Sequence, residues 1–90
     1  MIFPLHTHVH VPAGVHHWDA AWDAAGKCVE VEFPVIEEEF NGIIVRVIDH
    51  GREWEVDLRP GGSHTKIEDI ETGKTFMFLD STIDGKITRL

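Results

Sequence analysis

Five of the seven histidines of this chain fall within the thirteen residues HTHVHVPAGVHHW (6–18). The first three alternate along the chain, so on a β-strand they would share one face, roughly 6.5–7 Å apart. Two histidines at that spacing can bind one zinc ion, because bonds from zinc to imidazole nitrogen are about 2.0–2.1 Å long. A later histidine could return as a third ligand, and neutral imidazole also suits nickel and copper. The sequence therefore allows a Zn, Ni or Cu site formed by His6, His8, His10 and His17.

The same histidines also fit a purely structural role. The positions that alternate with them are mostly apolar, which is typical of a half-buried strand with one face in the core. These positions are Phe3, Leu5, Thr7, Val9 and Val11. Metal-bound imidazoles usually donate a hydrogen bond to a carboxylate or a carbonyl, and no carboxylate lies close to the first three histidines in the sequence. We therefore expect a solvated strand face without a cofactor, and the metal site is the alternative.

Negative charge is concentrated in the middle third of the chain. The formal net charge is −8, and residues 28–57 hold nine acidic residues against two arginines. Residues 1–27 have a net charge of −1, and residues 58–90 have five charges of each sign. Such an acidic segment repels phosphate, which disfavours direct binding to nucleic acid. It would attract a basic protein surface.

Most of these acidic residues alternate with apolar ones, which places them on the outward face of the expected strands. A mixture of both signs would be enough for solubility, whereas a run of like charges repels itself and destabilises the folded chain. We therefore interpret them as a stripe that binds a basic partner, formed by Glu30, Glu32, Glu37, Glu39, Glu53, Glu55 and Asp57. The alternative is that the stripe serves solubility and protects strand edges.

In size and charge the chain resembles small acidic phage-encoded inhibitors that occupy the nucleic-acid-binding surfaces of host proteins. The resemblance implies an inhibitor that mimics nucleic acid and docks an acidic sheet face on a basic protein surface. No arrangement of residues in the sequence indicates catalysis with comparable strength. Cys28 could act as a nucleophile beside a distant histidine, but a lone cysteine is more typical of a small buried apolar position. We predict a non-enzymatic binding module.

Length and composition indicate one small domain, residues 1–90. A chain of this length buries about 60–65% of the surface that its unfolded form exposes, so its core is small. No stretch approaches the roughly 20 apolar residues of a membrane-spanning helix. The N-terminus lacks the basic region and the cleavage site of a signal peptide. A single cysteine excludes an internal disulfide and favours the reducing cytosol.

Hydrophobic periodicity predicts an α+β domain that is mostly an antiparallel β meander. Residues 15–25 follow helical spacing, with Trp18 and Trp22 one turn apart on the buried side and Gly26 where a helix would end. Residues 2–11 and most of the chain after residue 27 alternate as strands do. We expect a small barrel or sandwich with one short helix near the N-terminus.

Turn residues predict where the strands reverse. Asn41-Gly42 is typical of a type I′ hairpin, which would set Glu37 across from Arg46. The sequence ETGK would join strands at residues 65–70 and 75–80, and residues 53–58 would form a further strand. A last hairpin at Asp84-Gly85 would place Asp80 opposite Arg89.

Overall fold

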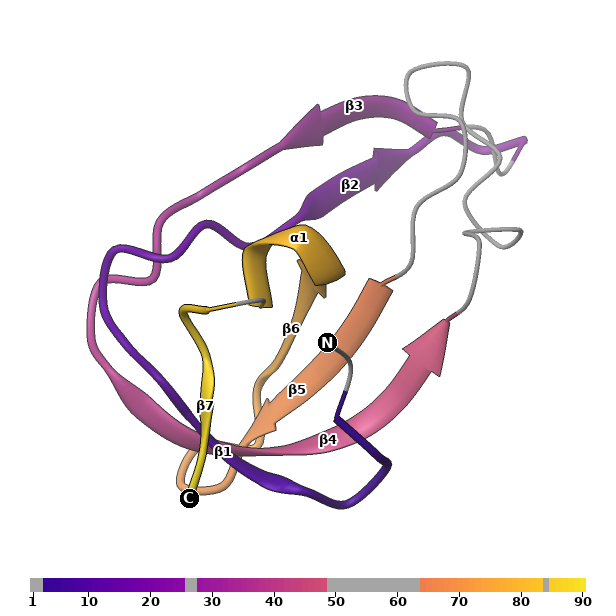
Figure 1. Cartoon of the computed structure of the whole chain (residues 1–90). Coiled ribbons are helices and arrows are strands. Elements are labelled where there is room, and N and C mark those ends of the chain that lie inside the picture. Colours follow the sequence, from indigo (N-terminus) through magenta and orange to yellow (C-terminus); the bar gives the residue numbers. More distant parts are fainter. Residues whose placement is uncertain (1–2, 26–27, 49–63, 84) are drawn as a thin grey trace.

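The computed structural model describes residues 3–25, 28–48, 64–83 and 85–90. Antiparallel β-strands make up half of these ranges, and a single helical turn is the one helix within them (Figure 1). In chain order the elements are β1 (His8–Val11), β2 (Asp19–Trp22), β3 (Cys28–Glu32), β4 (Phe40–Ile48), β5 (His64–Asp69), β6 (Thr75–Leu79), α1 (Asp80–Ile83) and β7 (Thr88–Arg89). The prediction of a mostly antiparallel β fold is confirmed.

A five-stranded sheet in the order β6-β5-β4-β1-β7 is the larger of the two sheets in the described structure. Its middle strand, β4, has nine residues and curves strongly in Figure 1. β4 pairs with β1 on one side and with β5 on the other, so that Ile44 lies opposite Ile67. The register shifts between Ile44 and Arg46, and an irregularity of this kind bends a strand and increases its twist.

A two-stranded sheet of β2 and β3, which we call the β2–β3 arm, follows β1 in the chain. Its pairing continues at its base, where the Gly14 N–H donates to the Ile36 carbonyl at 2.9 Å and the His17 N–H donates to the Pro34 carbonyl at 2.9 Å. The Trp18 N–H donates to a β6 carbonyl at 2.7 Å. The segment from β1 to β2 therefore contacts β4 at its start and β6 at its end, and the sheet curls around the core (Figure 1).

The core consists of aliphatic side chains and one phenylalanine from the five-stranded sheet, from α1 and from the segments between the strands. In β1, Val9 and Val11 are fully buried, whereas His8 is exposed and His10 is half-buried. The alternation predicted for this strand is therefore confirmed over these four residues. Fully burying one side chain of this kind contributes about 1.5–3 kcal/mol. The buried cluster comprises Val9, Val11, Val15, Ile36, Ile44, Ile67, Phe78, Ile83 and Ile87.

The helix predicted for residues 15–25 is wrong, because this segment forms β2 and the base of the β2–β3 arm. Helix propensities of ordinary residues differ by less than about 1 kcal/mol per residue, and a three-turn helix is marginal without packing. Pairing with β3 and with β6 satisfies the backbone instead and overrides the alanine-rich composition. Trp18 is buried as predicted, but from an extended segment. The side chain of Trp22 lies outside the described structure.

Asn41-Gly42 does not form the predicted turn but lies inside β4, which pairs on both sides at Gly42. A β-carbon built on Gly42 would lie 2.5 Å from Cγ2 of Ile67 and 2.9 Å from the carbonyl oxygen of Glu68. Both distances are shorter than a van der Waals contact. A glycine is therefore required here for the close approach of β5 and not for a reversal of the chain.

Two predicted side-chain pairs are wrong for related reasons. Glu37 precedes β4 whereas Arg46 lies within it, so no hairpin sets them face to face. Asp80 begins α1 and does not belong to a strand, while Arg89 belongs to β7, which pairs with β1. The hairpins that would have formed these pairs are replaced by contacts between segments far apart in the sequence.

The hairpin of β5 and β6 is confirmed. Asp69 organises its turn, because its Oδ1 accepts the backbone N–H of Glu71 at 2.9 Å and that of Thr72 at 3.4 Å. Gly73 has a φ of 75°, which suits glycine. The predicted strand at residues 53–58 lies outside the described residues. Among the described residues, none of the helical structure is long and apolar enough to cross a membrane.

Candidate functional site

The predicted histidine face is broken at its first member. The Thr7 N–H donates to the Pro4 carbonyl at 3.2 Å, and His6 in this turn has a φ of 69°. Such a φ is uncommon outside glycine, although histidine adopts it more often than most residues. β1 therefore begins only at His8. Leu5, predicted to face the core, is 52% exposed.

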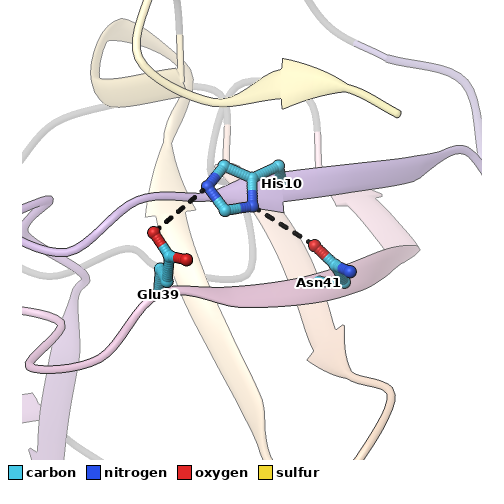
Figure 2. A network of polar contacts seen from close by, with 3 residues as sticks. All are labelled: His10, Glu39 and Asn41. Atoms are coloured by element: carbon cyan, nitrogen blue, oxygen red, sulfur yellow. Dashed lines mark hydrogen bonds and ion pairs between the residues drawn. The ribbon is translucent and has the colours of Figure 1, made fainter.

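His10 lies between two polar side chains (Figure 2). The pairing of β1 with β4 sets His10 directly opposite Asn41, and its Nδ1 lies 3.2 Å from Oδ1 of Asn41. Its Nε2 lies 3.8 Å from Oε2 of Glu39, in the loop before β4. The tautomer with a proton on Nδ1 donates to Asn41, and a second proton on Nε2 completes an ion pair with Glu39. Tertiary pairing thus supplies a carboxylate that the neighbouring sequence lacks.

His17 packs against the rings of two phenylalanines. Its ring centroid lies 5.0 Å from that of Phe76 and 6.4 Å from that of Phe78, both nearly edge-on. Burial lowers the pKa of the His17 imidazole below its usual value of 6.5; the charge of Asp19 partly opposes this effect and neighbouring His16 adds to it. A lowered pKa keeps this imidazole neutral at pH 7.

The described structure does not assemble the four histidines proposed as metal ligands. His6 is in a turn, His8 is exposed on β1, His10 faces Glu39 and Asn41, and His17 faces aromatic rings. Among the described residues, no three histidine, cysteine, aspartate or glutamate side chains are placed to share a metal ion. The arrangement gives no support to His6, His8, His10 and His17 as one ligand set.

Three carboxylates gather on the β2–β3 arm, and we call them the arm carboxylates (Asp19, Glu30 and Glu32). Asp19 of β2 is paired with Glu32 of β3, and all three side chains are exposed. A hydrogen bond with Glu30 and the negative charge of Glu30 raise the pKa of the Glu32 carboxyl above its usual value, and the charge of Asp19 adds a smaller effect. Like charges across a pair of strands destabilise it.

Three further carboxylates form the acidic loop (residues 37–39), between the arm and β4. All three side chains are exposed. The loop is anchored by the buried Ile36, whose N–H donates to the Val15 carbonyl at 2.8 Å. Glu30, Glu32, Glu37 and Glu39 of the predicted stripe thus lie on exposed positions of the arm and of this loop. The other members of the predicted stripe, Glu53, Glu55 and Asp57, lie outside the described residues.

Two pockets share the side chain of Phe40, and we call them together the Phe40 groove. The first is about 330 Å³ in volume, and the acidic loop, the β5–β6 turn and three rings line it. These rings belong to His17, Phe40 and Phe76. The second is about 340 Å³, and its lining includes His10, Glu39, Ile70 and Glu71. The centroids of the Phe40 and Phe76 rings are 5.3 Å apart, so neighbouring aromatic rings and several charged side chains line the same groove.

Comparisons with models of protein families, with curated proteins and with solved structures find no significant match to this chain.

The sequence indicated the acidic character of this region but not the groove. Phe40 and Phe76 are 36 positions apart in the printed sequence, and His17 comes from a segment predicted to be helical. No local pattern connects these three rings. Only the pairing of β1 with β4, of β5 with β6 and of Trp18 with Met77 brings them to one place. An aromatic residue directly after an acidic run was the one signal available.

Proposed function

We propose that this chain is a non-enzymatic binding module that docks an acidic surface on a basic surface of a partner protein. The partner surface would be one that ordinarily binds nucleic acid, so that the module acts as an inhibitor. We further propose that residues 1–90 form a single domain of the small barrel or sandwich type, and that the protein works in the reducing cytosol.

The arm carboxylates carry this proposal. Two strands pair there with Asp19 across from Glu32, and Glu30 is within hydrogen-bonding reach of Glu32. This arrangement destabilises the isolated protein, because like charges facing each other across a strand pair repel. A solubilising surface would not need such a concentration of one sign. A partner with lysine and arginine residues relieves the repulsion, so the cost in stability is regained on binding.

Charge also determines how such a module finds its partner. Complementary surface charges raise the association rate, and exposed charges are screened beyond about 8–10 Å at physiological ionic strength. The arm carboxylates and the acidic loop are exposed and therefore act through this long-range attraction. Association should be fast at low salt and should slow steeply as salt is added.

A double substitution on the arm tests the proposal with two readouts. We expect Glu30→Gln with Glu32→Gln to raise the melting temperature at pH 7 and low salt, because it removes the repulsion. The same variant should associate more slowly with a partner captured from the native cell, as measured by surface plasmon resonance. The difference in rate should vanish at high salt, roughly 0.5 M or more, where the Debye length falls below ~5 Å.

Two outcomes of these measurements would contradict the proposed function. A captured partner that is acidic, or an association rate that does not depend on salt, would overturn the proposal. An unchanged rate in the double variant together with a raised melting temperature would show that the arm carboxylates serve solubility alone.

A further inference from the structure

We infer that the Phe40 groove is the binding site for a lysine or arginine side chain that projects from a basic segment of the partner protein. This inference rests on the proposed function, because it names the place where the basic partner is held. The acidic arm attracts the partner at a distance, whereas the groove retains it after contact.

Charge complementarity identifies the occupant as cationic. Lys74 is the one lysine or arginine among the described residues that line the groove, and it faces a surplus of carboxylates. His17 adds no positive charge at pH 7, because burial lowers the pKa of its imidazole. The carboxylates that line the two pockets belong to Glu37, Glu38, Glu39, Asp69 and Glu71.

The rings of Phe40 and Phe76 distinguish this groove from the rest of the acidic surface. Phe40 and Phe76 are partly buried, and both side chains line the first pocket. Lysine and arginine have apolar stems that pack on such surfaces while the charged head stays near water or a carboxylate. A cationic side chain can therefore place its stem against the rings and its head at Glu37 and Glu38. Pockets of about 330 and 340 Å³ are large enough for such side chains.

The two walls of the groove are fixed before any partner arrives. The acidic loop is held by the buried Ile36, and the opposite turn is held by hydrogen bonds to Asp69 Oδ1. The two walls are also joined near Phe40, because the Ile70 N–H donates to the Asn41 carbonyl at 3.2 Å. A preformed site loses less entropy on binding than a mobile one, which favours affinity.

A titration with hexa-arginine peptide, followed by NMR of the ¹⁵N-labelled full chain at low salt, tests the inference. We expect the largest amide shifts at Phe40, Ile70 and Phe76. The variant Glu37→Gln with Glu38→Gln should bind the peptide more weakly than the matched variant Glu30→Gln with Glu32→Gln. Both remove two charges from exposed positions, and the groove pair should lose at least about threefold more affinity, since direct ion pairs are worth up to ~1 kcal/mol each.

A second pair of variants tests for an increase in peptide affinity. Unfolding of a variant would lower its affinity, so it could not produce this result. Lys74 competes with the incoming cation, so Lys74→Ala should tighten peptide binding by about two- to fivefold at low salt. Lys86→Ala makes the same change in net charge, and Lys86 does not line the groove. We expect the Lys86 variant to gain clearly less affinity.

The results separate the groove from the proposed function. Equal effects of both glutamate pairs and of both lysines, with shifts spread over the acidic surface, would overturn the groove and leave the proposed function intact. No binding of hexa-arginine to the wild-type chain would overturn the groove, while a basic partner captured from cells would still support the proposed function. Selective loss and selective gain at the groove variants would establish the inference.

Discussion

Histidines that alternate in the sequence have quite different surroundings in the structure. His8 is exposed on β1, while His10 is two residues away and faces Asn41 and Glu39. His17 is partly buried against Phe76. Their protonation therefore has different consequences for the fold. A positive charge on His10 completes an ion pair with Glu39, whereas a positive charge on His17 must be placed among aromatic rings.

His17 should make the stability of the fold depend on pH. Its pKa in the folded chain lies below 6.5, so the unfolded chain takes up this proton first as the pH falls. The contribution of neutral His17 is therefore fully present above about pH 6.5 and is lost as the pH falls below that value. Urea unfolding between about pH 7.5 and 5.5 should show a loss of stability that is smaller in His17→Gln. The control His8→Gln, at an exposed position, should keep the wild-type loss. Equal losses in all three proteins would contradict the prediction.

Secondary-structure elements in this fold are decided by which segments meet. The alanine-rich segment after His17 adopts a strand because it pairs with β3 along its length. Asn41-Gly42 remains inside β4 because β1 and β5 pair on both of its sides. In both cases a local preference of about 1 kcal/mol or less is weaker than the hydrogen bonds and burial that the pairing provides.

Adding a single methyl group at Gly42 should destabilise the fold. Gly42→Ala introduces a β-carbon 2.5 Å from Cγ2 of Ile67 and 2.9 Å from the Glu68 carbonyl oxygen. We expect a loss of about 1–3 kcal/mol in the free energy of unfolding, the usual range for overpacking a core. Chemical denaturation measures this loss. Repeating it in an Ile67→Ala background should give a smaller loss, because one of the clashing groups is gone. The same loss in both backgrounds would place the strain elsewhere.

Trp18 should anchor the β2–β3 arm to the sheet. Its side chain is buried, and its ring centroid lies 4.9 Å from that of His64. Its backbone N–H donates a hydrogen bond to the carbonyl of Met77 in β6. Trp18→Ala should lower the free energy of unfolding by about 3–5 kcal/mol, the usual loss for a large buried aromatic side chain. Lys86→Ala, at an exposed position outside the arm, should change it by about 0.5 kcal/mol or less. A Trp18 variant as stable as the wild type would show that the arm does not depend on this contact.

Across the whole molecule, apolar burial and negative charge act in opposite directions. The buried cluster joins β1, β4, β5, β6 and α1 without any histidine. The net charge of −8 opposes this cohesion by repulsion. The buried core therefore has to outweigh the repulsion among the surface charges.

The fold should therefore form without metal. We expect EDTA to leave the melting temperature of untagged protein unchanged in differential scanning calorimetry. Metal that binds only the folded state adds its binding energy to stability, so its removal would lower the melting temperature. A large drop would contradict the prediction and would make the histidines structural ligands.

The sequence by itself determined the features that depend on neighbouring residues. Alternation at β1 predicted that Val9 and Val11 are buried, and the ETGK turn predicted the β5–β6 hairpin. The excess of negative charge was also evident from composition. Period and charge are local properties, so they can be read without knowing the fold.

Only the tertiary structure decided which distant segments meet. It converted the expected helix at residues 15–25 into the β2–β3 arm and placed Gly42 against Ile67. It brought Glu39 to His10, and it formed the Phe40 groove from rings in three separate segments. The physical reason is that pairing and burial are summed over contacts between residues far apart in the chain, and this sum exceeds the local preferences of any short stretch.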